Sequence, residues 1–350
     1  MVGGIASIAA MPLAMPLPAP RALTRRALLA AAVALPALAS GRGPVRLRFS
    51  HVVAPDTPKG RMALHFQALV HERAGDRLRV EVHPDSQLWG DDDEIEALRL
   101  GAVEMLAPSL SKFGMAGVPE FEVFDLPYLF SEAAQVRRVT EGPVGQALLR
   151  RLERQQMLGL GFLDNGLKHM SAQRPLRRVA DFAGLRVRVQ ASRVIEAQWR
   201  ALGAQPVVLP FAETRQALAS GVVNATENPL SNFLTQGLAP LQPQLTLTGH
   251  GYLGYAVVTN PRFWASLPMA DRRLLGDALR AALLQGNRWA AELNRDALAV
   301  LRRQTGVVVH QPSEAERDGL RQALRGVSQM FERGPQGPWL KDVRAALMAK

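Results

Sequence analysis

Apolar positions recur with two different periods along the chain, and the two periods predict strands and helices in turn. Stretches that are apolar at every second position, or apolar throughout, predict strands at 45–49, 78–83, 104–108, 158–163, 185–189, 206–209, 222–225, 255–258 and 307–310. Apolar positions three or four residues apart predict helices at 57–75, 95–100, 132–155, 192–203, 212–220 and 271–303, with a last helix from 313. This alternation predicts an α/β fold with largely parallel sheets.

Local signals support several of these elements. Thr57-Pro58 supplies a hydroxyl cap and a proline in the first turn of a helix, and Ser192 can cap another. Residues 121–130, FEVFDLPYLF, are apolar enough to lie at a buried junction. The acidic run 91–94 (DDDE) directly precedes a helix, where negative charge complements the helix dipole. We favour that interpretation over a metal site and expect no bound metal.

The first 40 residues predict a signal segment, because they contain three arginines and no acidic residue. The stretch 24–29, TRRALL, resembles the twin-arginine export signal and is followed by an apolar run to Ala39. That run has about 13 residues, against the roughly 20 that a membrane-spanning helix needs. A retained membrane anchor is the alternative. We expect export to the periplasm, by the twin-arginine route, with no membrane span after Ser40.

Composition and charge exclude several classes of protein. The 350 residues are 47% hydrophobic and 21% charged, which fits about two globular domains. With no cysteine, the chain has no disulfide, no thiolate nucleophile and no cysteine zinc site. The net charge of +11 includes no run of five like charges and no basic stripe with interleaved aromatic residues. We therefore do not expect nucleic-acid binding.

Motifs typical of catalysis are absent or incomplete. Residues 249–254 match GxGxxG by letter, but the next residues predict a strand where the dinucleotide motif requires a helix. Residues 109–112 match SxxK without the SDN or KTG motifs that accompany it. No HExxH, GxSxG or P-loop occurs. We therefore predict that the protein is not an enzyme and carries no cofactor.

A long ordered series of motifs resembles a known family. Its central part is DNGLKHMSA at 164–172, GLRVRV at 184–189, LGAQP at 202–206, PFAE at 210–213 and TENP at 226–229. Further matches are SHVV at 50–53, TPKG at 57–60, APS at 107–109 and HGYLGY at 250–255. Over about residues 45–330 the chain resembles the extracytoplasmic solute-binding proteins of tripartite ATP-independent periplasmic (TRAP) transporters. It is most similar to their C4-dicarboxylate-binding branch, the DctP family.

The resemblance implies a two-lobed periplasmic binding protein-like fold, with hinge-crossing strands and a long interdomain helix. We expect residues 41–165 and about 254–293 in lobe I, and residues 166–253 and about 294–350 in lobe II. A solute would be enclosed between the lobes, and the GxGxxG-like stretch would belong to an interdomain crossing. The implied partners are a small carboxylate and the two membrane permease subunits, and we expect a monomer.

The resemblance also implies ligand-binding residues. It assigns a bidentate salt bridge with the solute carboxylate to Arg188, and a place in the site to Asn228 and Phe211. Lys168 stands where sialic-acid-binding members have a second arginine, which favours a small diacid over sugar acids. Further candidates are Lys59, Ser109 and His51.

The residue types of these candidates suit a dianion. Burying two negative charges requires two cationic groups: the planar fork of arginine suits one carboxylate, and a lysine can hold the other. Only five of the 42 basic residues are lysines, and three of those, Lys59, Lys112 and Lys168, fall in motif-like stretches.

Other interpretations stay open for each residue and for the function. A lysine can be a surface charge, Asn228 a turn residue and Phe211 a core residue. Strand periodicity alone does not decide whether Arg188 faces a cleft or solvent. The alternative functions are a member of the same family that binds another organic acid, and a periplasmic ligand sensor for a membrane kinase.

Overall fold

A mixed sheet of nine strands forms the centre of the computed structural model, which describes residues 43–349. The strands are β1 (Val45–Ser50), β2 (Leu78–His83), β3 (Met105–Leu106), β4 (Leu158–Ala172), β5 (Arg186–Val189), β6 (Gln205–Val208), β7 (Ala225–Asn228), β8 (Gln244–Thr259) and β9 (Val308–His310). Their order is β2-β1-β3-β8-β4-β7-β5-β6, and β9 pairs with β8. The predicted signal segment, including its twin-arginine motif, lies outside the described residues.

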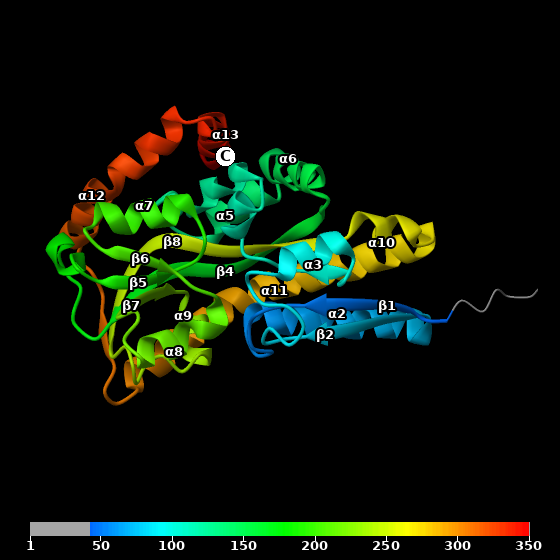
Figure 1. The fold of residues 1–350 in the computed structure, drawn as a ribbon, viewed down its shortest axis with the longest axis horizontal. Coiled ribbons are helices and arrows are strands. Elements are labelled where there is room, and N and C mark those ends of the chain that lie inside the picture. The colour runs from blue at the N-terminus through cyan, green and yellow to red at the C-terminus, as the bar shows by residue number, and fades with distance from the viewer. Residues whose placement is uncertain (1–42, 350) are drawn as a thin grey trace, which may run out of the picture. The chain divides into compact units, whose positions relative to one another are not determined.

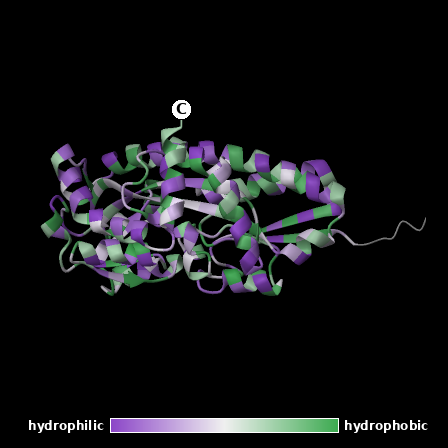
Figure 2. Ribbon diagram, turned by 90° about the horizontal axis from the view of Figure 1, so that it is seen from above, coloured by the Kyte–Doolittle hydropathy of each residue, from purple (hydrophilic) through white to green (hydrophobic). Residues whose placement is uncertain are grey.

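Helices surround this sheet, and Figure 2 shows hydrophobic and hydrophilic residues alternating along them. The helices are α2 (Pro58–Ala74), α3 (Glu94–Leu100), α4 (Lys112–Met115), α5 (Ala133–Thr140), α6 (Pro143–Arg151), α7 (Arg193–Ala201), α8 (Thr214–Ala219), α9 (Leu230–Thr235), α10 (Pro261–Ser266), α11 (Met269–Arg303), α12 (Glu314–Arg333) and α13 (Gly337–Met348). Among the described residues, no helix is both long enough and apolar enough to span a membrane.

The expectation of largely parallel sheets is correct at the two ends of the sheet and wrong in its middle. Strands β1, β2 and β3 pair in parallel, as do β5, β6 and β7. The central pairs β3–β8, β8–β4 and β4–β7 are antiparallel. The reason is that β4 and β8 are long strands that run through the middle of the sheet in opposite directions.

These two strands have 15 and 16 residues, far longer than the predicted strands at 158–163 and 255–258. The apolar pattern ends early because polar residues and glycines occupy the middle of both strands. Register shifts interrupt their pairing at Asp164/Gly166 and Lys168/Met170. Gly166 has φ +155 there, a backbone conformation that L residues rarely adopt.

The two ends of the sheet belong to the two lobes of the fold, which confirms the predicted architecture. We call the region of β1–β3, α2 and α3 the first lobe, and the region of β5–β7, α7 and α8 the second lobe. Figure 1 shows β4 and β8 side by side, extending from one lobe to the other. The 35-residue helix α11 packs on α2 and β4 and also contacts α9. At Gly286 this helix lies so close to Met62 and Leu163 that a Cβ would collide with both.

Other predicted elements differ in their boundaries. The single helix expected at 132–155 is divided into α5 and α6, because Gly142-Pro143 breaks it and proline has no N–H to continue the helix. The strand expected at 222–225 lies at Ala225–Asn228 instead. Helices α4, α9, α10 and α13 were not predicted as separate helices.

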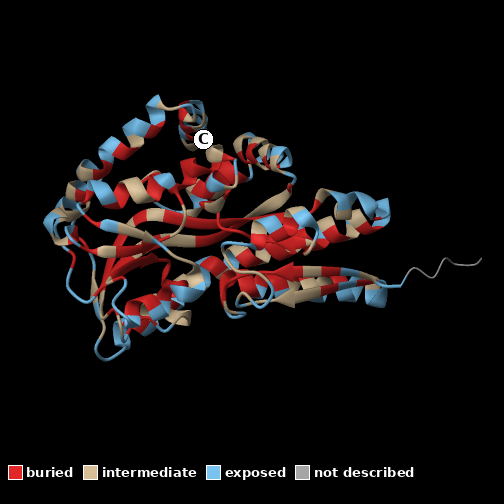
Figure 3. Cartoon of the chain, viewed as in Figure 1, coloured by how far each residue is buried: buried red, intermediate tan, exposed pale blue. Residues whose placement is uncertain are grey.

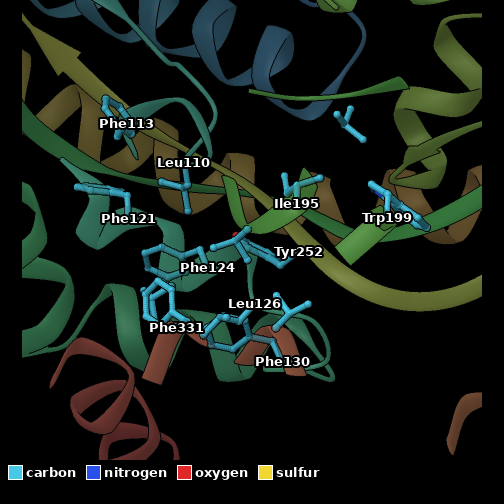
Figure 4. Packing of buried hydrophobic residues seen from close by; sticks show 14 of the residues in the cluster. Leu110, Phe113, Phe121, Phe124, Leu126, Phe130, Ile195, Trp199, Tyr252 and Phe331 are labelled. Atoms are coloured by element: carbon cyan, nitrogen blue, oxygen red, sulfur yellow. The ribbon is translucent and has the colours of Figure 1, made fainter. Parts of the chain in front are cut away.

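The core confirms the buried junction predicted at 121–130. Phe124 stacks on Phe130, and both Phe121 and Phe124 lie against Phe162 of β4. Figure 4 shows Phe124 and Phe130 close to Tyr252 of β8, with Phe121 on the other side of Phe124. Figure 3 shows that the central strands are mostly buried and that exposed residues lie on the outer faces of the helices. The aromatic junction thus packs directly on the two crossing strands.

Candidate functional site

A small cavity lies where the two lobes meet. Its wall comes from the loops after β1, β2, β3, β5 and β6, from the start of α2, from α9, from β5 and β7, and from the crossing strands. The lining residues are Val52, Val53, Lys59, Asp91, Ser109, Lys168, Arg188, Gln190, Phe211, Glu227, Asn228, Asn232, Leu253 and Tyr255. Six of the seven predicted site residues are among them. His51 is not.

Arg188 in β5 lines the cavity, and one edge of its guanidinium is held by the backbone. Its Nε and Nη2 donate to the carbonyl oxygen of Leu209, at 2.9 and 2.7 Å, and its guanidinium lies 5.7 Å from the ring centre of Phe211. Its side chain makes no salt bridge within residues 43–349. Burial lowers the pKa of Arg188, and Asp91 and Glu227 oppose that shift. Because an arginine stays protonated, the free edge can take a carboxylate.

Lys59 is the second buried cation that has no carboxylate partner among the described residues. It lies in the first turn of α2, which begins where the Thr57 side chain accepts the Gly60 N–H and Pro58 needs no partner. Its Nζ donates to the carbonyl of Ala107 at 3.0 Å and lies 4.0 Å from the centre of the Tyr255 ring. The side chain is 1% exposed. Burial lowers the pKa of Lys59 to about 8.

Lys168 in β4 is already paired. Its Nζ lies 2.9 Å from Oε1 of Glu227, and Nε2 of His250 lies 2.8 Å from Oε2 of the same carboxylate. Although burial alone would raise it, Lys168 and His250 lower the pKa of Glu227 to about 2. An ionised carboxylate only accepts hydrogen bonds, so Nε2 of His250 donates to Glu227, and Nδ1 of the same ring lies 2.7 Å from the hydroxyl oxygen of Thr248. The charge of Lys168 is therefore compensated within the protein.

The acidic run before α3 contributes to the cavity, which its interpretation as a helix-dipole feature did not predict. Asp91 lines the wall and forms an ion pair with Lys112. Lys112 also pairs with Glu94, which is completely buried. Asp93 occupies the N-cap position without a capping bond from its side chain. The run thus supplies buried ion pairs as well as the start of a helix.

Three further predicted residues lie on the wall. The Oγ of Ser109 accepts from Nε2 of Gln190 at 2.8 Å, a bond that joins the first lobe to the second. Asn228 ends β7 with its Nδ2 3.2 Å from the Oγ1 of Thr226. Phe211 donates its N–H to Asp91.

His51 lies behind this wall rather than on it. The residue is fully buried, and its two neighbours Val52 and Val53 face the cavity in its place. Neither ring nitrogen has a hydrogen-bond partner among the described residues. Burial and the nearby Lys59 lower the pKa of His51 to about 3, so the ring is neutral at physiological pH.

Sequence reasoning missed five polar residues of the wall: Asp91, Gln190, Glu227, Asn232 and Tyr255. Glu227 lies in the TENP motif and Tyr255 lies in the HGYLGY motif, so both could have been proposed as site residues from those motifs. Asn232 and Tyr255 are held by Asn165, whose Nδ2 donates to both. Gln190 shows no signal beyond its place directly after a strand.

The charges of the wall determine what the cavity can bind. Two carboxylates on the wall, Asp91 and Glu227, are each neutralised by a lysine. Within the described residues this leaves Lys59 and Arg188 as wall cations without a carboxylate partner. No group of three or more His, Cys, Asp or Glu in the described part of the chain could hold a metal ion. The arrangement is suited to holding an anion.

Several known proteins are similar to this chain in sequence and in fold. The family model DctP, bacterial extracellular solute-binding protein family 7, matches residues 49–334. A C4-dicarboxylate-binding periplasmic protein DctP from Rhodobacter capsulatus is 46% identical over 320 residues, which cover 89% of this chain and 95% of that protein. A TRAP periplasmic solute binding protein from Shewanella oneidensis, crystallised with succinate, is 39% identical with a TM-score of 0.85, covering 87% of this chain and 99% of that one.

A more distant structure shows how broadly the fold is used. The sugar acid binding protein DctPAm from Advenella mimigardefordensis, in complex with galactonate, is 26% identical with a TM-score of 0.84, covering 87% of this chain and 98% of that one. The resemblance deduced from the motifs is confirmed by the match over 286 residues (334 − 49 + 1) and by the identity to the Rhodobacter protein. The chain belongs to the DctP family of bacterial extracellular solute-binding proteins.

Proposed function

We propose that this protein binds a C4-dicarboxylate, such as succinate, malate or fumarate, between its two lobes and delivers it to a TRAP membrane permease. The observation that carries the proposal is the pair of cations on one cavity wall, Lys59 and Arg188, that have no carboxylate partner among the described residues. A dianion would compensate both. The names of the Rhodobacter and Shewanella relatives agree with this choice of ligand.

Arg188 would hold one carboxylate. Its Nε and Nη2 are committed to the carbonyl of Leu209, which leaves the Nη1–Nη2 edge for two parallel hydrogen bonds to the ligand. The ring of Phe211 lies against the guanidinium and supports its orientation. Asn228 lines the same wall and would donate to the remaining ligand oxygens.

Lys59 would hold the other carboxylate, which revises the role given to Lys168 from the sequence. The ion pair between Lys168 and Glu227 already satisfies that ammonium charge, whereas Lys59 has only a carbonyl oxygen and an aromatic face beside it. We propose that Lys168 and Ser109 help to form the wall of the cavity but supply no uncompensated charge to the ligand. His51 would act only by packing behind Lys59.

Closure of the lobes would couple binding to delivery. Because Lys59 belongs to the first lobe and Arg188 to the second, a ligand makes all its contacts only when the lobes are closed. Lobe boundaries at 41–165 plus about 254–293, and at 166–253 plus about 294–350, fit the positions of the crossing strands. The protein would act in the periplasm after export by the twin-arginine route, as a monomer, with the two permease subunits as partners.

A panel of acids tests the proposed ligand. We expect succinate, malate and fumarate at 100 times Kd to stabilise the protein by about 2.7 kcal/mol and to raise its melting temperature. Butyrate, with the same chain length and one charge, serves as the control and should leave the temperature unchanged. A shift with galactonate or a keto acid but none with the C4-diacids would contradict the proposed ligand.

The affinity should depend on pH through Lys59. Its pKa of about 8, well below the ordinary 10.5, follows from burial, which Glu94 and Asp91 oppose and Lys112 reinforces; His51 and Tyr255 are its neutral neighbours. A bound dianion favours the charged ammonium, so Kd should begin to rise above about pH 7 and be about ten-fold higher at pH 9 than at pH 7.

Calorimetry at pH 7 and pH 9, in buffers of different ionisation enthalpy, measures this dependence and should detect proton uptake at pH 9. Stability of the ligand-free protein should move in the opposite direction and increase between about pH 8 and 10.5. In that range the unfolded chain still binds the proton that the folded state has lost. Equal Kd values at the two pH values, without proton uptake, would exclude Lys59 as an anchor.

A further inference from the structure

An aspartate on the wall of an anion-binding cavity requires an explanation. Asp91 lines the same wall as Arg188 and is close enough to influence the pKa of that guanidinium. Near the site of a dianion, a carboxylate opposes binding to the extent that its charge is not offset by its own cationic partner, here Lys112. Such a residue is expected to provide a compensating contact.

The carboxylate of Asp91 is held at both oxygens. Oδ1 forms an ion pair with Nζ of Lys112, whose ammonium also pairs with Glu94 and reaches the Asp91 carbonyl at 3.2 Å. Oδ2 accepts the backbone N–H of Phe211. Lys112 thus neutralises the carboxylate of Asp91 through Oδ1, and Oδ2 is directed across the cavity to Phe211.

The donor of that bond belongs to the loop that holds Arg188. Leu209, two residues before Phe211, accepts the guanidinium of Arg188 with its carbonyl. The ring of Phe211 faces the same guanidinium, and its own carbonyl accepts Nε2 of Gln236. The contact from Asp91 therefore connects the first lobe to the segment that positions the main anion-binding residue.

One more polar bond crosses the wall beside it, from Nε2 of Gln190 to Oγ of Ser109. At the cavity wall, both bonds must break for the lobes to separate, because each has one partner in either lobe. Away from the wall, the lobe ranges given above also place the Arg193–Glu122 ion pair and the Ser192–Asp125 hydrogen bond across the lobes. Of the two bonds at the wall, only the bond to Asp91 has an ionised acceptor, and charged hydrogen bonds are about twice as strong as neutral ones.

We propose that Asp91 is the latch of the closed form: its carboxylate, held by Lys112, binds the Phe211 N–H across the cavity and slows release of the solute held at Arg188. The identity of that solute rests on the function proposed above. The latch is a positioning role, because Asp91 acts through Phe211 and donates nothing to the ligand.

The test measures solute dissociation by stopped flow in Asp91→Ala and Asp91→Asn. We expect Asp91→Ala to dissociate at least about ten times faster than the wild type, the effect of losing one hydrogen bond to a charged acceptor. Asp91→Asn keeps an oxygen for the Phe211 N–H and should lie between the two. Asp92→Ala is the matched control: it removes the same charge from an exposed neighbour and should dissociate like the wild type.

A second readout follows closure itself. The chain has no cysteine, so Leu100→Cys and Val222→Cys, at positions 75% and 51% exposed in the two lobes, can carry a spin-label pair. With saturating ligand, Asp91→Ala should show a larger open fraction than the wild type. If Asp91→Ala slows solute dissociation, the proposal of a latch is wrong and Asp91 acts only as an opposing charge. The proposal is equally wrong if neither the dissociation rate nor the distances between the spin labels change.

Failure of the ligand proposal gives a different result. If the wild type binds none of the C4-diacids, that proposal alone fails. The same ratio of dissociation rates is then measured with the acid that the panel identifies.

Discussion

Arg188→Ala should abolish calorimetrically measurable binding of succinate and malate. Arg188 is 4% exposed and lines the cavity with a guanidinium that has a free edge, so its loss leaves a ligand carboxylate buried without its bidentate partner. Truncating one partner of a buried charge pair costs about 2–5 kcal/mol, which raises Kd from about 30-fold to several thousand-fold. Arg188→Lys should be only partly tolerated, because a point charge cannot serve both the Leu209 carbonyl and a bidentate carboxylate.

Arg186→Ala provides a matched control on the same strand. Arg186 is half-buried and donates to the carbonyls of Gly221 and Val222 rather than to the cavity. This variant should bind succinate like the wild type. If Arg188→Ala, with a normal melting temperature, binds a C4-diacid as the wild type does, the assigned site is wrong.

Lys59→Met should lower affinity for succinate by about 30-fold or more while leaving the protein at least as stable. The ammonium is buried without a carboxylate partner, so in the ligand-free protein its charge is a cost that methionine removes. The ligand then loses its second cation. Affinity and melting temperature should thus change in opposite directions, as expected when a binding residue is retained at the expense of stability. Calorimetry and thermal unfolding on the same sample measure both.

Substitutions of Lys112 and Lys168 test whether Lys59 is the second cation that holds the ligand. Lys112→Met removes the partner of two carboxylates, Asp91 and Glu94, and should lower the melting temperature. Lys168→Met leaves Glu227 without its ammonium and should also destabilise the protein. If Lys59→Met binds succinate normally, and Lys168→Met, paired with Glu227→Gln to remove the unpaired charge, loses binding, the second anchor is Lys168.

The scarcity of lysine carried more information about the site than any single motif. In a chain with 37 arginines, the three lysines found in motif-like stretches all lie at one cavity: Lys59 and Lys168 on its wall, and Lys112 behind Asp91. The alternative interpretation of these residues as surface charges is wrong, because all three side chains are at most 10% exposed. A compact ammonium fits a small cavity better than the larger guanidinium.

The sequence by itself determined the family, the two-lobed α/β fold, the long helix α11 and six of the fourteen residues that line the cavity. These features depend on apolar periodicity and on ordered motifs, which are local properties of the chain. Tertiary structure decided the lengths of β4 and β8, because their polar and glycine-rich middles are strands only when paired with each other. It also decided which charges are free. Lys168 is neutralised by Glu227, 59 residues away, and Asp91 is held by Lys112 and Phe211. Ion pairing depends on distance in space, and the spacing of residues along the chain does not specify that distance.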